Sequence, residues 1–191
     1  MSNHNYFRVV EDCLAPEFCN YLIELGERVG FVESTLNGVP ARDFRRSLSC
    51  KLDLIDPLSG LSGQHLYEFK KAIMANLPKV YKGKTLVDVT SNSLNILKYG
   101  TGDYFKRHTD GSWYDSSRNL CSLITCQVYL NTLSKDQGGS TIFYNDDGSL
   151  YMDYIPKQGS VVFFDHMWLH EGGLMLKGTK YAFRISALYS R

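Results

Sequence analysis

The feature that most constrains the fold of this chain is a change of pattern near residue 87. Beyond it, short runs rich in β-branched and aromatic residues are separated by clusters of Gly, Asn, Asp and Pro. This pattern is typical of a sandwich or barrel and not of alternating strands and helices. The expected strands cover residues 93–99, 122–130, 140–144, 160–164 and 181–189. The second half of the chain is therefore predicted to be mainly β.

The first third of the chain has a helical pattern instead. Apolar residues recur every three or four positions in residues 15–26, where Pro16 suits a first turn and Gly26 an end. The same spacing runs through residues 63–77, and Pro78 is expected to end that helix. Helices followed by a run of strands are the order expected when helices buttress one face of a double-sheet jelly roll.

The predicted fold class is therefore mainly β with flanking α-helices, a double-stranded β-helix (jelly roll, cupin-like) buttressed by N-terminal helices. No repeat or low-complexity linker divides the chain, so residues 1–191 are expected to form a single domain. Residues 1–86 would form the helical buttress and a long loop, and residues 87–191 the jelly-roll core.

Charge and cysteine usage exclude some classes of protein. Lys and Arg number 21 against 20 for Asp and Glu, which argues against the broad basic surface of a non-specific nucleic-acid binder. The 5 cysteines are odd in number and scattered, which argues against a disulfide framework. The polar N-terminus and the absence of a run of ~20 apolar residues indicate no membrane partner. We expect a reducing, cytoplasmic compartment.

A candidate metal site comes from three residues. On an extended segment, His108 and Asp110 project to the same side, and His170 follows an apolar strand. Two histidines and one carboxylate leave three metal positions open, an arrangement that suits Fe(II). A His-x-Asp pair arises often by chance, and structural histidines are the commoner case. His166 and His170 also have the i, i+4 spacing of a helical metal pair, but the neighbouring glycines argue against a helix there.

A second candidate feature lies in the last predicted strand. Alternation places Lys180, Ala182, Arg184 and Ser186 on one face of an otherwise apolar strand. Because a buried cation is costly unless it is paired, an anionic ligand would explain this face. The alternative is an edge strand with solvated charges.

Six motifs in order resemble the prolyl-4-hydroxylase-like branch of the Fe(II)/2-oxoglutarate-dependent oxygenases. They are Tyr99-Gly100-x-Gly102-x-x-Phe105-x-x-His108-x-Asp110-Gly111, Thr125-Cys126-x-x-Tyr129-Leu130-Asn131, Gly138-Gly139-Ser140-Thr141-x-Phe143, Pro156-x-x-Gly159-Ser160, His170-Glu171-Gly172 and Gly178-Thr179-Lys180-Tyr181. The similarity covers most of the chain.

The resemblance implies a 2-oxoglutarate-dependent dioxygenase that hydroxylates an unactivated C–H bond. It implies that His108, Asp110 and His170 are catalytic and hold Fe(II), with 2-oxoglutarate and O2 as cosubstrates and ascorbate as an accessory reductant. The cosubstrate pocket would be lined by Tyr99, Tyr129 and Thr141. The distal carboxylate of 2-oxoglutarate would be bound by Lys180, or by Arg184 with Ser186, a pair similar to the Arg-x-Ser of other branches. Both cations stay candidates.

The substrate is left open by the sequence. Residues 36–49 have the composition of a loop, and in the family this region lies near the mouth of the site. We expect it to be mobile, and its Arg45 and Arg46 are candidates for contact with an anionic substrate, although a solvated loop is an equal alternative. The candidate functions are hydroxylation of a prolyl or other residue in a peptide, hydroxylation of a free amino acid or small metabolite, and a non-catalytic jelly-roll binding module. Near-neutral charge counts against nucleic-acid demethylation.

Overall fold

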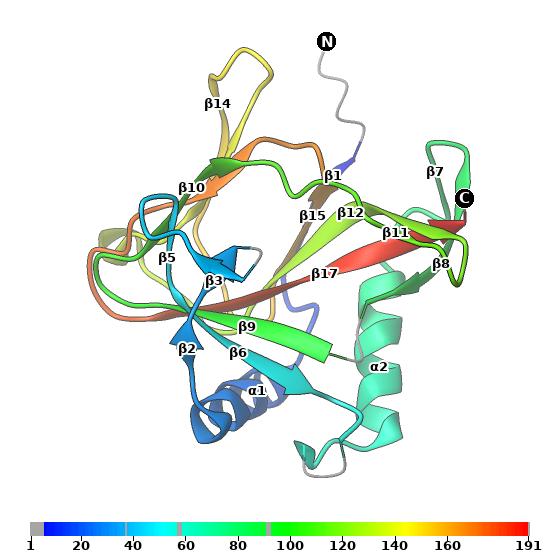
Figure 1. The fold of residues 1–191 in the computed structure, drawn as a ribbon, viewed down its shortest axis with the longest axis horizontal. Coiled ribbons are helices and arrows are strands. Elements are labelled where there is room, and N and C mark those ends of the chain that lie inside the picture. The colour runs from blue at the N-terminus through cyan, green and yellow to red at the C-terminus, as the bar shows by residue number, and fades with distance from the viewer. Residues whose placement is uncertain (1–5, 37, 57–58, 91–92, 191) are drawn as a thin grey trace.

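The computed structural model describes residues 6–36, 38–56, 59–90 and 93–190, which form two main antiparallel sheets, a small two-stranded hairpin and two α-helices (Figure 1). The helices are α1 (Pro16–Val29) and α2 (Gly63–Met74). Along the large sheet the strands are β1 (Phe7–Val10), β15 (Val161–Asp165), β12 (Leu120–Tyr129), β17 (Lys180–Ser190), β9 (Ser93–Tyr99), β6 (Leu48–Asp53) and β2 (Val32–Glu33). Strand β11 (Tyr114–Asp115) pairs with β12, β8 (Lys84–Val89) with β17, and β7 (Val80–Tyr81) with β8.

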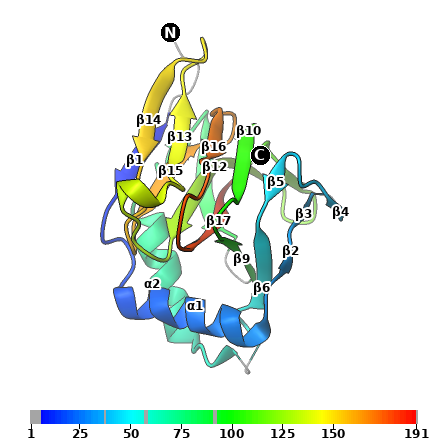
Figure 2. The same cartoon turned by 90° about the vertical axis from the view of Figure 1, so that its left-hand side faces the viewer.

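The small sheet forms the second layer. Its order is β14 (Leu150–Tyr154), β13 (Thr141–Tyr144), β16 (His170–Gly172), β10 (Tyr104–His108) and β5 (Arg45–Arg46). A separate hairpin joins β3 (Thr35–Leu36) to β4 (Val39–Pro40), and a 3-10 turn spans Lys135–Gln137. Both helices lie on one side of the large sheet, and the small sheet lies on the other (Figure 2). This is the predicted jelly roll buttressed by helices.

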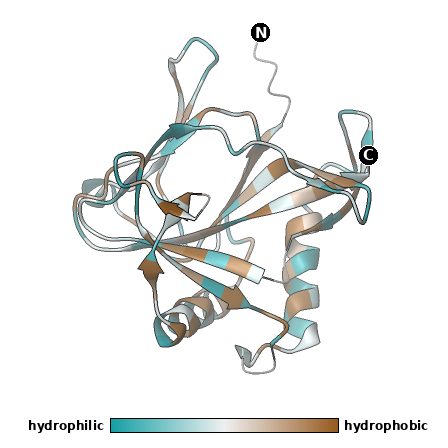
Figure 3. Cartoon of the chain, in the orientation of Figure 1, coloured by the Kyte–Doolittle hydropathy of each residue, from teal (hydrophilic) through white to brown (hydrophobic). Residues whose placement is uncertain are grey.

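Alternation along β17 separates the two layers of the core. Phe183 and Ile185 are buried in the cluster that the large sheet forms with α1 and α2. Ala182 faces the other way, into the cluster between the two sheets. Each fully buried side chain of Phe or Ile size contributes about 1.5–3 kcal/mol relative to exposure. Hydrophobic positions accordingly concentrate on the strands and on the helices beside them (Figure 3).

Helix α1 forms where the sequence predicts it. Pro16 occupies the first turn, where its missing N–H is not needed, and Gly30 follows the helix with φ of 98°. The buried face carries Cys19, Leu22 and Leu25. Helix α2 begins at Gly63 as expected, but it ends at Met74 and not at residue 77. The apolar spacing continues into the following turn, where Leu77 is still buried.

The N-terminal part is less purely helical than predicted. Strands β1, β2, β6 and β7 lie within residues 1–86 and β8 begins there, so five strands of the large sheet come wholly or partly from this part of the chain. Residues 36–49 are likewise not one loop, because they include β4, β5 and the start of β6. The two-residue strands β2, β4, β5 and β7 are too short to have a pattern of their own, and long-range pairing stabilises them.

Two general features complete the description. Neither helix in the described ranges is long and apolar enough to cross a membrane. Each of the 5 cysteines has a free thiol.

Candidate metal centre and cosubstrate pocket

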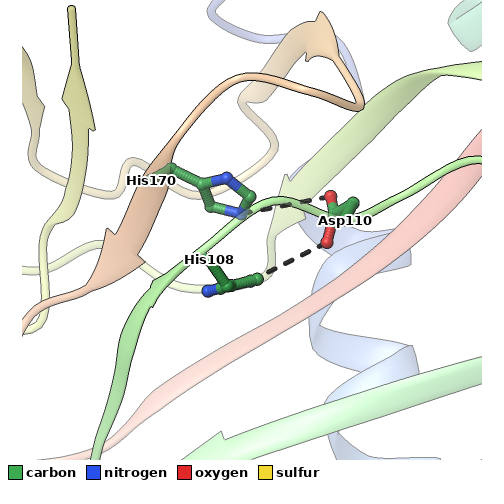
Figure 4. A group of neighbouring side chains, drawn as sticks. All are labelled: His108, Asp110 and His170. Atoms are coloured by element: carbon green, nitrogen blue, oxygen red, sulfur yellow. Dashed lines mark ion pairs between the residues drawn. The ribbon is translucent and has the colours of Figure 1, made fainter. Parts of the chain in front are cut away.

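The three predicted metal ligands lie together on the small sheet. His108 ends β10, His170 begins β16, and the two residues stand opposite each other in the register of these strands. Asp110 follows β10 by two residues. One ligand atom from each residue lies within 4.8 Å of the other two. The two imidazoles and the carboxylate converge on one point from two neighbouring strands (Figure 4).

Both imidazoles are held in the state that a metal requires. Nδ1 of His108 lies 2.8 Å from the carbonyl of Lys106, and Nδ1 of His170 lies 2.8 Å from that of Trp168. Since a carbonyl only accepts, each Nδ1 carries the proton and each Nε2 has a free lone pair. Burial lowers the pKa of His108 to about 4 and also lowers the pKa of His170. Both rings are therefore neutral at pH 7, and their Nε2 atoms lie 3.8 Å and 4.0 Å from the carboxylate of Asp110.

Asp110 is an ionised carboxylate in a buried position. Its side chain is 3% exposed. Burial would raise its pKa, but the charge of Arg184 and the hydrogen bond from Thr125 outweigh burial, and the pKa is lowered. The guanidinium of Arg184 contacts Oδ1, and the hydroxyl of Thr125 donates to Oδ2 over 2.5 Å.

A third histidine, His166, stands behind this carboxylate. Oγ1 of Thr125 lies 2.7 Å from Nδ1 of His166, which is 2% exposed. Because the hydroxyl proton of Thr125 is donated to Asp110, Oγ1 of Thr125 can only accept a hydrogen bond from His166. The proton of the His166 ring therefore lies on its Nδ1. Sequence reasoning treated His166 as a structural residue and gave Thr125 no role. The missed signal is alternation along β12, which turns Thr125 toward the small sheet.

The metal-ligand cluster opens into a pocket between the two sheets with a volume of about 320 Å3. Its described lining includes all three candidate ligands and the cations Arg45, Lys180 and Arg184. Tyr99, Thr141, Gln127 and several apolar side chains complete the wall.

Lys180 is the buried cation at the inner part of the pocket. It is 4% exposed, and Nζ donates to the carbonyl of Gly139 at 2.7 Å and to Oγ1 of Thr141 at 3.4 Å. No carboxylate among the described residues forms an ion pair with it. Burial lowers its pKa to about 7. A lysine in this situation is half-charged near neutrality and gains from an incoming anion.

The predicted pocket residues divide into three groups. Tyr99 and Thr141 line the pocket, and burial raises the pKa of Tyr99 to about 12, so its hydroxyl is protonated. Tyr129 is fully buried behind the wall and donates to Thr141 at 2.7 Å. Ser186 lies outside the described lining, and its backbone N–H donates to the side chain of Thr90 at 2.8 Å.

The two substrate-side arginines point to different places. Arg45 lines the pocket, together with its neighbour Phe44. Arg46 is not part of the described lining, its side chain is 61% exposed, and it lies 3.9 Å from Asp103. Consecutive residues of strand β5 face opposite sides, so only one of the pair can face the site.

The donor set fits the implied cofactors. Two neutral imidazoles and a carboxylate on one side of an open pocket are the facial arrangement of non-haem Fe(II) oxygenases. The described lining of one pocket includes both the candidate metal ligands and the buried Lys180, a combination that suits the dicarboxylate 2-oxoglutarate.

Comparison with known proteins agrees with this geometry. Residues 94–186 match the family model of the 2OG-Fe(II) oxygenase superfamily. The comparison with curated protein sequences gave no match.

Solved structures of prolyl hydroxylases are similar in fold. A prolyl-4-hydroxylase from Pseudomonas putida has a TM-score of 0.72 at 17% identity, over 99% of this chain and 94% of its own. A prolyl hydroxylase from Trichoplax adhaerens was solved with a peptide of hypoxia inducible factor. It has a TM-score of 0.73 at 16% identity, and the match covers 95% of this chain and 82% of the Trichoplax chain. The collagen prolyl hydroxylase of Paramecium Bursaria Chlorella virus-1 has a TM-score of 0.65 at 20% identity, and the match covers 98% of this chain and 97% of the viral chain. At these identities the similarity concerns the fold. The family match over residues 94–186 and this similarity of fold support a 2-oxoglutarate-dependent hydroxylase of the 2OG-Fe(II) oxygenase superfamily with a prolyl-4-hydroxylase-like fold.

Proposed function

We propose that His108, Asp110 and His170 hold the Fe(II) of this dioxygenase, and that Lys180 binds the distal carboxylate of 2-oxoglutarate. The observation that carries the proposal is the placement of all four side chains on one pocket. Lys180 is favoured over Arg184 as the residue that binds this carboxylate. It is buried and unpaired among the described residues, whereas Arg184 is half-exposed and contacts Asp110.

The chemistry follows the superfamily reaction. Fe(II), 2-oxoglutarate and O2 supply the oxidising power that converts R–H to R–OH, with succinate and CO2 as the other products. The protein residues supply positioning. Backbone carbonyls orient both imidazoles, Thr125 orients the carboxylate of Asp110, and the protonated Lys180 fixes the cosubstrate. Apolar side chains of both sheets line the rest of the pocket and limit the access of water.

A residue in a peptide, prolyl first, is our first candidate substrate. Its support is the fold similarity to prolyl hydroxylases, one of them solved with a peptide. Hydroxylation of a free amino acid or small metabolite is the second candidate. The cationic side chains of the pocket favour it, because a free acid brings its own negative charge.

Succinate release tests the proposal. Purified protein with Fe(II), 2-oxoglutarate, O2 and ascorbate should release succinate slowly without substrate and faster with one pool of peptides or of amino acids. Ascorbate is included because it would return oxidised iron to Fe(II). A cytoplasmic location is part of the proposal, because the free thiols and Fe(II) both persist under reducing conditions. Succinate release that does not depend on iron contradicts the proposed chemistry.

A further inference from the structure

Two arginines reach the pocket from opposite sheets. Arg45 belongs to β5 of the small sheet, and Arg184 belongs to β17 of the large sheet. Both line the pocket that contains the metal ligands. Burial lowers the pKa of Arg45, and the positive charge of Arg184 lowers it further, so the two guanidiniums act on each other across the space.

Arg45 lacks a counter-charge. Its Nε is buried and has no hydrogen-bond partner among the described residues. One terminal nitrogen donates to the carbonyl of Thr35, and the guanidinium lies 5.2 Å from the ring centroid of Phe105. No carboxylate in the described ranges forms an ion pair with it. A half-buried guanidinium with a free donor is costly unless an anion arrives.

The complete site carries a surplus of positive charge. The described lining has three permanent or potential cations, Arg45, Lys180 and Arg184, and one carboxylate, Asp110, and a histidine that binds a metal does so as a neutral imidazole. Fe(II) and the dianion 2-oxoglutarate cancel each other. With Lys180 protonated against the cosubstrate, the loaded site has three positive charges against one negative, a surplus of two.

The contacts of Arg184 indicate which kind of anion would balance the surplus positive charge. Its guanidinium already contacts a carboxylate, that of Asp110. When Asp110 binds the metal, the remaining donors of the planar guanidinium fork are available, and this fork matches the geometry of a carboxylate. Gln127 stands opposite Arg184 in the strand register and adds an amide donor to the same wall.

We propose that the substrate of this enzyme presents a carboxylate to Arg45 and Arg184, next to the carbon that is hydroxylated. This rests on the proposed dioxygenase function and narrows its substrate class. The carboxylate belongs either to a free amino or carboxylic acid, or to an acidic side chain or C-terminus of a peptide. A prolyl residue remains a candidate within a peptide that supplies such a carboxylate, whereas a neutral prolyl peptide offers no partner to Arg45 and should not stimulate turnover.

Matched acid and amide pairs test the proposal without any variant. The probes are free L-amino acids against their carboxamides, and short peptides with Glu, Asp or a free C-terminus against the same peptides with Gln, Asn or an amidated C-terminus. Succinate release above the substrate-free rate is measured. We expect each acid to stimulate succinate release at least tenfold more than its amide does. A response to free amino acids assigns the carboxylate to a free acid, and a response to acidic peptides assigns it to a peptide. Calorimetric titration of protein loaded with Mn(II) and 2-oxoglutarate gives the same comparison without turnover.

Three variants then assign the preference for acids to the two arginines. Arg45→Gln and Arg184→Gln should each reduce the acid-to-amide ratio at least tenfold, and Arg45→Lys should keep part of it. Arg42→Gln is the matched control, because Arg42 is exposed, pairs with Glu33 and lies outside the described lining. It should leave the ratio unchanged.

The outcomes separate the two proposals. Equal stimulation by acids and amides, stimulation by neutral or phosphorylated members alone, or stimulation by no acid member overturns the carboxylate proposal. If the wild type still releases succinate without substrate, the dioxygenase function stands. Absence of iron-dependent succinate release overturns the function itself.

Discussion

The hydroxyl of Thr125 joins Asp110 to His166. Its Oγ1 donates to Oδ2 of Asp110 over 2.5 Å and lies 2.7 Å from Nδ1 of His166. The candidate metal carboxylate is therefore fixed from behind by a chain of two buried groups on the large sheet side. Partners of this kind orient metal ligands and typically change metal affinity when they are removed.

Replacing Thr125 by Val should weaken metal binding. Val keeps the shape but removes the hydroxyl, so Asp110 loses a donor and His166 an acceptor. We expect the dissociation constant for Fe(II) or Co(II) to rise about 10–100-fold, measured by titration of the metal-free protein. Thr125→Ser is the control, because it keeps the hydroxyl and should bind within a few-fold of wild type. Equal affinity in Thr125→Val and wild type contradicts the orienting role.

Lys180→Met and Arg184→Met distinguish the two candidates for the distal carboxylate. Loss of Lys180 removes the buried partner of that carboxylate and should weaken 2-oxoglutarate binding by about 2–5 kcal/mol, roughly 30-fold or more in Kd. Loss of Arg184 should change this Kd much less. Calorimetry on metal-loaded protein measures both. A larger loss in Arg184→Met shows that Arg184 holds the cosubstrate.

Cosubstrate binding should weaken as the pH rises above about 7. In the free site the pKa of Lys180 is about 7, because burial disfavours the charged amine. Binding of a carboxylate requires the protonated form and raises this pKa, so the complex takes up a proton above pH 7. The Kd of 2-oxoglutarate should therefore be flat below pH 7 and rise up to about tenfold per pH unit above it.

The control for this pH effect is Lys180→Arg. Arginine stays charged over the whole range, so the slope between pH 7 and 9 should disappear. Calorimetry at saturating metal gives both curves. An affinity for 2-oxoglutarate that increases with pH in the wild type contradicts a neutral lysine in the free site.

Gly159 should be essential for stability. Its φ is +76°, and an added Cβ would lie 2.2 Å from the carbonyl oxygen of Leu14. Gly159→Ala should reduce the free energy of unfolding by about 1–2 kcal/mol for the backbone conformation and by about 1–3 kcal/mol more for the contact. Gly148→Ala is the matched control, because Gly148 has φ of +80° with open space around it. Urea denaturation should show the larger loss for Gly159→Ala, and equal losses contradict the steric argument.

The elements with a clear pattern could be predicted from the sequence. Strand β9 has the predicted bounds, because its apolar residues alternate between bounding turns. The metal-ligand candidates could also be identified, since His-x-Asp and a later His form a recognisable set. The face of β17 that carries Lys180 and Arg184 followed from alternation alone and lines the pocket as expected.

The remaining elements depend on contacts that no local pattern encodes. Strand β16, which carries His170, has only three residues, and β5 has only two. Both exist because β10 lies between them and pairs with each. The separation of Arg45 from Arg46 follows from that pairing. The role of Thr125 required knowledge of which residue stands behind Asp110, which is a property of the folded sheet.

The most direct test of the account measures metal-dependent succinate formation in wild type, His108→Ala and Asp110→Ala, beside the control His65→Ala, an exposed histidine of α2 outside the described lining of the pocket. Wild type and the control should release succinate from 2-oxoglutarate only when Fe(II) and O2 are present, and both ligand variants should release none above background. Succinate formation at the wild-type rate in either ligand variant, or none in wild type with all cofactors supplied, would contradict the assignment of the metal centre.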